Sequence, residues 1–263
     1  MPSLNVVKEF GENEMYHVYN RGVEKRIIFT DKRDYAVFLS FLKYALLADE
    51  ENKQEDIVDV QQISDAQRFN LRRLGLSGKL DLVSYCLMPN HFHLLFFQHD
   101  PDAITKLMRS VATGYSIYFN KRHNRTGSLF QGVYKASRIN SDAYWAHITR
   151  YIHLNPLDIG KDYQTYDYSS FPVYMGVRQQ EWVKPDIVLG GFRSPKAYKK
   201  FVESYIPYRK ELKEIKGMLA NSRDVQGWTL YSGVPAEGAF WVVSKTLGLR
   251  RRCRWILQRS GHW

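Results

Sequence analysis

The sequence predicts an α+β fold, in which helices pack on an antiparallel sheet. Segments rich in strand-forming residues, at 15–20 and 81–98, are separated by a segment in which apolar residues recur at helical spacings of three and four. The Pro-Asn pair at 89–90 divides the longer strand-rich segment, where a tight turn would reverse one strand into an antiparallel neighbour. Hydrophobic residues make up 44% of the 263 residues, which is enough to bury a core under such a sheet.

The first strand, at 15–20, alternates along its length and ends in turn-forming residues. An amphipathic helix follows, and either Thr30 or Asp31 can cap it. The apolar face of this helix consists of Tyr35, Phe38, Leu39, Leu42, Ala45 and Leu46. The next stretch, about 48–80, is polar, first acidic and then basic, and we interpret it as an insertion before the second strand.

The second and third strands, at 81–88 and 91–98, form the predicted hairpin. Asp100 and Pro101 then supply an N-cap and a proline at the first helical position. The helix that they begin has an apolar face formed by Ile104, Leu107, Met108, Val111, Tyr115 and Tyr118. Beyond its basic end, residues 128–135 are rich in strand formers and predict a further strand.

Two histidines, His91 and His93, begin the third strand. Side chains alternate along a strand, so both imidazoles point to one face while Phe92 and Leu94 point to the other. Two imidazoles that an apolar strand holds on one face make half of a metal site, which needs one or two further ligands. The alternative is that both histidines are polar positions on the solvated face of an edge strand.

A later helix begins near residue 142 and ends before Pro156. One stripe of this helix is formed by Tyr144, Ile148, Tyr151 and Asn155. A stripe of Tyr and Ile normally belongs to the core, and we expect this of its first two members. Tyr151 and Asn155 differ because both bring polar tips to the last turn, where the end of a helix can meet the face of a sheet.

The formal net charge of +11 and the pI near 9.5 favour an anionic partner. Nucleic acid ranks ahead of a membrane, because no continuous apolar run approaches the roughly 18 residues of a spanning helix; an ordinary basic surface is the alternative. Basic residues interleaved with aromatic ones at 121–135 suit a nucleic-acid groove, where cations meet phosphates and rings stack on bases. The basic stretch 249–263 could contact nucleic acid or simply fray.

The two cysteines, Cys86 and Cys253, lie far apart and in no CxxC pattern, so neither a disulfide framework nor a structural zinc site is expected. Residues 1–14 are mixed polar and acidic and lack the apolar core of a signal peptide. These features predict a cytoplasmic protein.

Four short motifs follow one another along residues 15–175. They are YHVYNRG at 16–22, MPNHFHLL at 88–95, GSLFQG at 127–132 and YIHLNP at 151–156. In order and spacing they resemble the successive signatures of the REP-associated tyrosine transposases, which belong to the HUH single-tyrosine transposase-like nucleases. Four signatures in register are far more specific than a lone His-x-His pair, so the resemblance favours the metal-site interpretation of the histidines.

The resemblance implies a ferredoxin-like sheet and a metal-dependent enzyme that nicks single-stranded DNA and transfers the strand. In such enzymes a tyrosine attacks phosphorus and leaves a 5′-phosphotyrosine; here this residue would be Tyr151. A divalent metal, Mg²⁺ or Mn²⁺, would be held by His91, His93 and Asn155 and would polarise the scissile phosphate. The expected partner is single-stranded DNA that folds into hairpins, from repeated palindromic elements.

Five basic residues are candidates for DNA contacts: Arg21, Lys121, Arg122, Arg125 and Lys135. The resemblance fixes a catalytic domain at 1–176, with the insertion at about 48–80. Residues 177–263 are then expected to form a mostly helical, basic C-terminal extension that could act as a DNA clamp.

Two other functions are alternatives to a metal-dependent strand transferase. A domesticated, non-catalytic nucleic-acid-binding protein on the same fold would need none of the chemistry that His91, His93, Tyr151 and Asn155 offer together. A zinc hydrolase built on the two histidines lacks a neighbouring His or carboxylate at ligand spacing.

Overall fold

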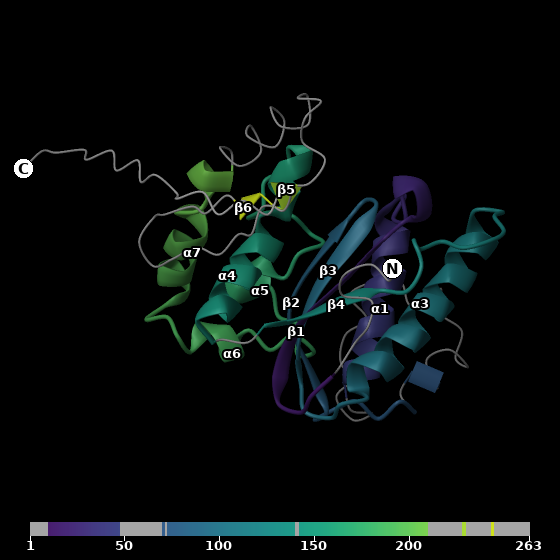
Figure 1. The fold of residues 1–263 in the computed structure, drawn as a ribbon, viewed down its shortest axis with the longest axis horizontal. Coiled ribbons are helices and arrows are strands. Elements are labelled where there is room, and N and C mark those ends of the chain that lie inside the picture. Colours follow the sequence, from purple (N-terminus) through teal and green to yellow (C-terminus); the bar gives the residue numbers. More distant parts are fainter. Residues whose placement is uncertain are drawn as a thin grey trace, which may run out of the picture. The chain divides into compact units, whose positions relative to one another are not determined.

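The computed structural model describes residues 10–47, 70–71, 73–139, 142–209, 228–229 and 243–244. Its larger sheet has four strands in the spatial order β2-β3-β1-β4, and every neighbouring pair is antiparallel (Figure 1). The strands are β1 (Glu14–Arg21), β2 (Leu80–Met88), β3 (His91–Gln98) and β4 (Lys135–Ile139). With helix α1 (Lys32–Leu46) between β1 and β2 and helix α3 (Ala103–Arg122) between β3 and β4, this is the ferredoxin-like arrangement. The predicted α+β class and ferredoxin-like sheet are confirmed.

Helices cover both faces of this sheet (Figure 1). On one face lie α1 (Lys32–Leu46) and α3 (Ala103–Arg122), which pack with the sheet around the larger hydrophobic core. On the other face lies α4 (Asp142–His153), which shares a second core with three shorter helices. These helices are α5 (Phe171–Tyr174), α6 (Asp186–Leu189) and α7 (Pro195–Glu203).

The alternation of β3 assigns its side chains to these two cores. Phe92, Leu94 and Phe96 are buried in the core under α1 and α3. Leu95 belongs to the core on the α4 side. His91 and His93 have the same parity as Leu95, so they point to the α4 face of the sheet.

The ends of two helices show which local predictions hold. Asp31 caps α1 as expected: its Oδ1 accepts from the backbone N–H of Arg33 at 3.0 Å and of Asp34 at 3.3 Å. The helix predicted to begin at Pro101 begins two residues later, at Ala103. The reason is that Asp100 Oδ1 accepts from Asp102 N at 2.9 Å, which forms a turn ahead of the helix.

The strand predicted at 128–135 is wrong for most of its length. Only Lys135 belongs to β4, and Phe130 makes an isolated bridge to Gly22. Gly127 and Gly132 have φ values of +82° and +76°, a backbone conformation that interrupts a strand.

The chain consists of two compact units, Met1–Ile206 and Pro207–Trp263. In the second unit, β5 (Trp228–Thr229) pairs antiparallel with β6 (Val243–Ser244). Helices α6 and α7 belong to the first unit, and the domain boundary expected at 176 stays a prediction. Most of the insertion at 48–80 and the basic stretch 249–263 lie outside the described residues. Among the helices that are described, none has the length and apolar character needed to cross a membrane.

Candidate active site

The four sequence motifs meet at one end of the sheet. Gly22 N, where β1 ends, donates to Asn90 O in the β2–β3 turn at 2.9 Å. Asn20 Nδ2 donates to Gly132 O at 3.2 Å, which ties the third motif to the first. A Cβ at Gly22 would lie 2.3 Å from Arg26 O, so only glycine fits this approach. Segments more than 100 residues apart in sequence thus build one surface.

Strand register places the site's polar side chains on the α4 face of the sheet. In the β1–β3 pair, Tyr19 lies opposite His93 and Arg21 lies opposite His91. In the β1–β4 pair, Lys135 lies opposite Tyr19. Directly opposed residues share a face, so these five side chains belong to one polar surface. We call this surface, with His17 and the end of α4, the candidate site.

The turn residue Asn90 orients the imidazole of His91. His91 Nδ1 lies 2.7 Å from Asn90 Oδ1, and the amide of Asn90 is fixed because its Nδ2 donates to Lys25 O at 3.2 Å. An amide oxygen only accepts, so His91 carries its proton on Nδ1 and presents a lone pair on Nε2. This is the tautomer that a metal ligand needs.

His93 has a different neighbour at its Nδ1, the imidazole of His17. The two nitrogens, His17 Nε2 and His93 Nδ1, lie 2.9 Å apart. Both side chains are buried, with 8% and 7% of their surface exposed. Tyr19 stacks on His17, with ring centroids 5.0 Å apart, and its ring also lies 6.1 Å from that of His93.

Burial keeps two of these histidines neutral. It lowers the pKa of His17 to about 4. It also lowers the pKa of His91 to about 4, and the nearby positive charge of Arg21 acts in the same direction. Neutral imidazoles at physiological pH have lone pairs that can bind a metal ion.

Tyr151 lies on α4 with its ring edge-on to the histidines. Its ring centroid is 5.5 Å from that of His93, at an interplanar angle of 81°, and 6.2 Å from that of His17. The side chain remains 37% exposed, so a substrate can reach it. The structure therefore brings Tyr151 beside His93, as the motifs predicted, and beside His17.

Asn155 follows α4 and closes its last turn. Its Nδ2 donates to Tyr151 O at 2.9 Å and to Ile152 O at 3.2 Å, and the residue is 3% exposed. With Nδ2 committed to the helix, Oδ1 is the atom that could bind a metal. Pro156 begins a 3-10 helix, Asn155–Ile159, in place of a further α-helical turn.

Two imidazoles and one amide oxygen form a donor set that can bind a divalent metal. Within the described ranges, no group of three or more His, Cys, Asp or Glu could hold a metal ion, so His91 and His93 would need the oxygen of Asn155 to complete a three-ligand set. Mixed nitrogen and oxygen ligands suit Mn²⁺, and Mg²⁺ would keep several waters there.

The candidate DNA-binding residues divide between the two faces of the sheet. Arg21 and Lys135 lie on the face of the candidate site. Lys121, Arg122 and Arg125 lie at the end of α3, which packs on the opposite face. Arg122 also forms ion pairs with Asp31 at 2.6 Å and Asp34 at 2.5 Å, which neutralise its charge within the protein.

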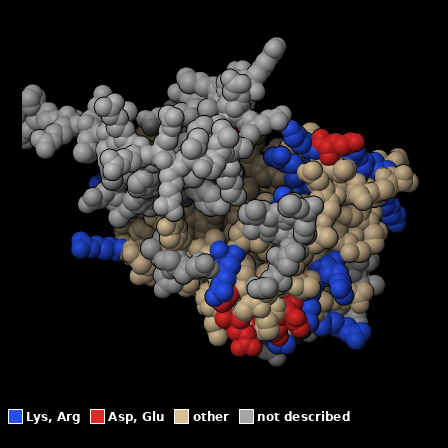
Figure 2. Space-filling view, viewed as in Figure 1, with Lys and Arg blue, Asp and Glu red and all other residues tan. Residues whose placement is uncertain are grey.

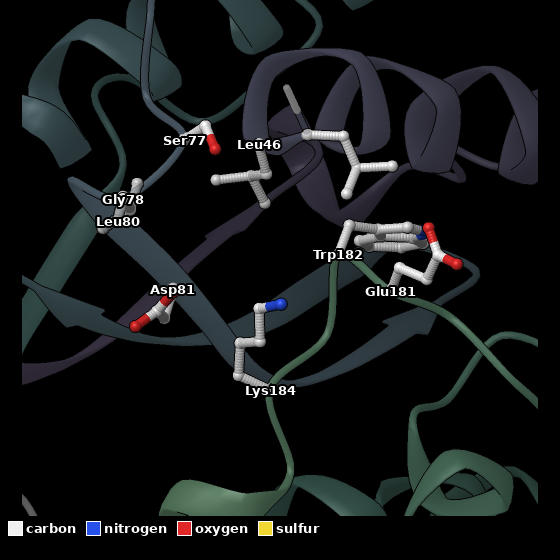
Figure 3. Close-up of a pocket in the computed structure, with 9 residues that line it drawn as sticks. Leu46, Ser77, Gly78, Leu80, Asp81, Glu181, Trp182 and Lys184 are labelled. Carbon is white, nitrogen blue, oxygen red and sulfur yellow. The ribbon is translucent and has the colours of Figure 1, made fainter. Parts of the chain in front are cut away.

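In the part of the chain that the structure describes, charge and shape elsewhere do not indicate a competing site. Figure 2 shows Lys and Arg side chains in several separate groups on the face that it displays, with acidic residues close to some of them. One pocket, drawn in Figure 3, lies between Leu46, Leu80 and Trp182. It adjoins the start of β2, whereas the histidines adjoin the end of that strand, so this pocket is not part of the candidate site.

Two residues of the site were missed by sequence reasoning, His17 and Tyr19. Both belong to the first motif and lie two residues apart in β1, just as His91 and His93 lie two residues apart in β3. Their period of two was available as a signal, but only the pairing of β1 with β3 shows that the two strands share this face.

Comparisons with known proteins bear on the family. Residues 52–155 match the family model described as "Transposase IS200 like". The structure of a REP-associated tyrosine transposase bound to a REP hairpin is 12% identical, with 68% of this chain and 95% of that chain covered and a TM-score of 0.40. A putative transposase from Deinococcus radiodurans R1 is 22% identical, with coverages of 58% and 95% and a TM-score of 0.24. No curated protein matches the chain. The matched stretch contains the His-x-His pair, Tyr151 and Asn155, so over these residues the chain is similar to the IS200-like transposases.

Proposed function

We propose that this protein is a transposase, which nicks single-stranded DNA and transfers the strand through a 5′-phosphotyrosine on Tyr151. The Tyr151 Oη attacks phosphorus, a bond from that oxygen to phosphorus forms, and the bond from phosphorus to the 3′ oxygen breaks. The proton that the phenol loses is balanced by the proton that the departing 3′ oxygen gains, so this oxygen ends as a hydroxyl. Attack by a 3′-hydroxyl on the phosphotyrosine reverses these steps, so the strand is rejoined without an external energy source.

The observation that carries this proposal is the placement of the Tyr151 ring 5.5 Å from the His93 ring, on a partly exposed helix face. A nucleophile and a metal ligand must lie this close if both act on one phosphate. Tyr115, a tyrosine on α3, differs in this respect. Tyr115 is fully buried on the opposite face, where it donates to Ile28 O at 2.5 Å.

His91, His93 and Asn155 would hold the divalent metal, Mg²⁺ or Mn²⁺. When bound, this ion polarises the scissile phosphate and stabilises the charge that develops on it. Asn90 holds the His91 ring in the required tautomer, and the side chains of Arg21 and Lys135 supply further positive charge on the same face. A hairpin formed by a repeated palindromic element is the proposed substrate, on the strength of the four motifs.

The nucleophile is tested by trapping the adduct. The full chain is incubated with Mn²⁺ and a fluorescent hairpin oligonucleotide, and covalent complexes are counted on denaturing gels. Tyr151→Phe should abolish the adduct and leave hairpin affinity nearly unchanged. Tyr144→Phe, an exposed tyrosine on the same helix, is the matched control and should form adduct normally. An undiminished adduct in Tyr151→Phe would move the nucleophile elsewhere.

The metal role is tested by chelation. EDTA should stop cleavage, and Mg²⁺ or Mn²⁺ added in excess should restore it. Cleavage that persists after exhaustive chelation would remove the proposed role of His91 and His93. Tight hairpin binding without a nick in any divalent metal would instead favour a non-catalytic DNA-binding protein.

The proposed DNA contacts are tested by comparing basic residues on the two faces of the sheet. Arg21→Gln and Lys135→Gln should each weaken hairpin binding and reduce the slope of log affinity against log salt by about 1, because each removes one phosphate contact. Arg125→Gln, at the end of α3 on the opposite face, is the matched control. A larger effect from Arg125→Gln than from the other two would place the DNA track along α3.

A further inference from the structure

We propose that His17 is a positioning residue, which holds His93 in the tautomer that binds the metal. The inference rests on the proposed metal-dependent function and concerns a residue of β1 that carries no other assigned role. It starts from the 2.9 Å contact between His17 Nε2 and His93 Nδ1. Two neutral imidazoles at this distance share one proton, so one nitrogen donates and the other accepts.

The direction of this hydrogen bond decides whether His93 can be a ligand. If His93 Nδ1 donates to His17, His93 presents a lone pair on Nε2 and can bind a metal ion through it. If His17 donates, the proton of His93 sits on Nε2 and blocks that nitrogen. His17 therefore has to act as the acceptor in the metal-competent state, with its own proton on Nδ1.

The neighbouring ligand shows the same arrangement with a different acceptor. Nδ1 of His91 faces the amide oxygen of Asn90 at 2.7 Å. In the metal-competent state each candidate ligand thus has an acceptor at Nδ1 and its lone pair on Nε2, and such outer contacts typically change metal affinity about 10- to 100-fold.

The surroundings of His17 also favour a fixed ring. Its ring contacts the rings of both Tyr19 and His93, with both centroids 5.0 Å away and interplanar angles of 25° and 20°. The Tyr151 ring approaches edge-on at 6.2 Å. A ring so enclosed has few alternative rotamers, and it can transmit its orientation to His93.

The inference is tested by Mn²⁺ binding to the full chain without DNA, measured by calorimetry. His17→Phe keeps a ring of similar size and removes the acceptor, and we expect its affinity for Mn²⁺ to fall about 10- to 100-fold. His99→Phe makes the same exchange just after the other end of β3 and should leave the affinity unchanged. An unchanged affinity in a folded His17→Phe chain would overturn the inference.

A second measurement needs no variant. Long-range ¹H–¹⁵N spectra of the metal-free wild-type chain report the tautomer of each histidine, and we expect His93 and His91 to carry their protons on Nδ1. A proton on Nε2 of His93 would overturn the inference. So would pulsed EPR of bound Mn²⁺ that shows His17 as a direct nitrogen ligand. A wild-type chain that binds Mn²⁺ but never forms a DNA adduct would instead refute the proposed function and leave this inference standing.

Discussion

The buried imidazole of His153 offers a direct test of what holds α4, and with it Tyr151, against the rest of the fold. His153 Nδ1 lies 2.7 Å from the Tyr198 hydroxyl, and Nε2 lies 2.8 Å from Ser170 Oγ. The Ser170 hydroxyl donates to Tyr85 O at 3.3 Å, so it accepts from His153 Nε2 and Nδ1 accepts from Tyr198. These bonds link α7, α4 and the segment beside β2.

Tyr198→Phe removes the hydroxyl but keeps the ring, which packs against Tyr174 and Phe192 at centroid distances of 4.8 and 5.1 Å. His153 Nδ1 then lacks a donor in a site from which water is excluded, because both side chains are fully buried. An unpaired buried polar atom costs about 1–3 kcal/mol. We therefore expect the free energy of unfolding to fall by about 2 kcal/mol.

Urea denaturation followed by circular dichroism measures this loss. The midpoint should fall while the dependence of the free energy on urea stays the same, because the folded surface is unchanged. Tyr144→Phe removes a hydroxyl from an exposed position of α4 and should change the free energy by no more than about 0.5 kcal/mol. A loss below about 0.5 kcal/mol for Tyr198→Phe would refute the assigned hydrogen bond.

Three further predictions concern stability and use the same titration, with EDTA present. Burial lowers the pKa of His153 to about 3, so below the unfolded pKa of about 6.5 the unfolded chain binds a proton that the folded chain excludes. This residue should thus lower stability by about 1.4 kcal/mol per pH unit as the pH falls from about 6.5 towards 3; equal midpoints at pH 8 and pH 5 would contradict it. Gly22→Ala should cost about 1–3 kcal/mol, because the new Cβ would lie 2.3 Å from Arg26 O. Asp34→Asn should cost about 2 kcal/mol, since it removes the buried negative charge that pairs with Arg122 and replaces one acceptor oxygen with an NH2 donor. The adduct yield per folded molecule should not change, because the pair lies on the face opposite the candidate site.

The sequence predicted the parts of the fold that depend on local periodicity. The β2–β3 hairpin and α1 with its Asp31 cap both appear where the patterns placed them. Each combines a clear period with a specific turn or cap residue, so local and tertiary preferences agree. The predicted strand at 128–135 fails because strand formers there are interrupted by glycines with positive φ, at 127 and 132, and composition alone does not report φ.

Within the candidate site, sequence reasoning could place residues on a face but could not name their partners across the sheet. The juxtaposition of Tyr151 with His93 was predicted from motifs on two separate elements, and the ring contact confirms that the two are neighbours. The contact of His17 with His93 depends on the register of β1 against β3, which strands 70 residues apart do not reveal. The ion pairs of Arg122 were likewise hidden, because its carboxylate partners lie on α1 and just before it.

Along the single strand β3, the residues on one face of the sheet stabilise the core, and the residues on the other face belong to the candidate site. In β3, Phe92 and Leu94 point into the larger core, while His91 and His93 point to the candidate site. A one-residue slip in register would exchange these sets, burying imidazoles among aromatic rings and exposing phenyl rings where DNA is proposed to bind. The bond from Gly22 N to Asn90 O at 2.9 Å, at the end of the β1–β3 pair, opposes such a slip. The glycine that permits this approach therefore serves the register of the face that carries the candidate site as much as the turn itself, which explains why a residue with no side chain stands among the motifs of that site.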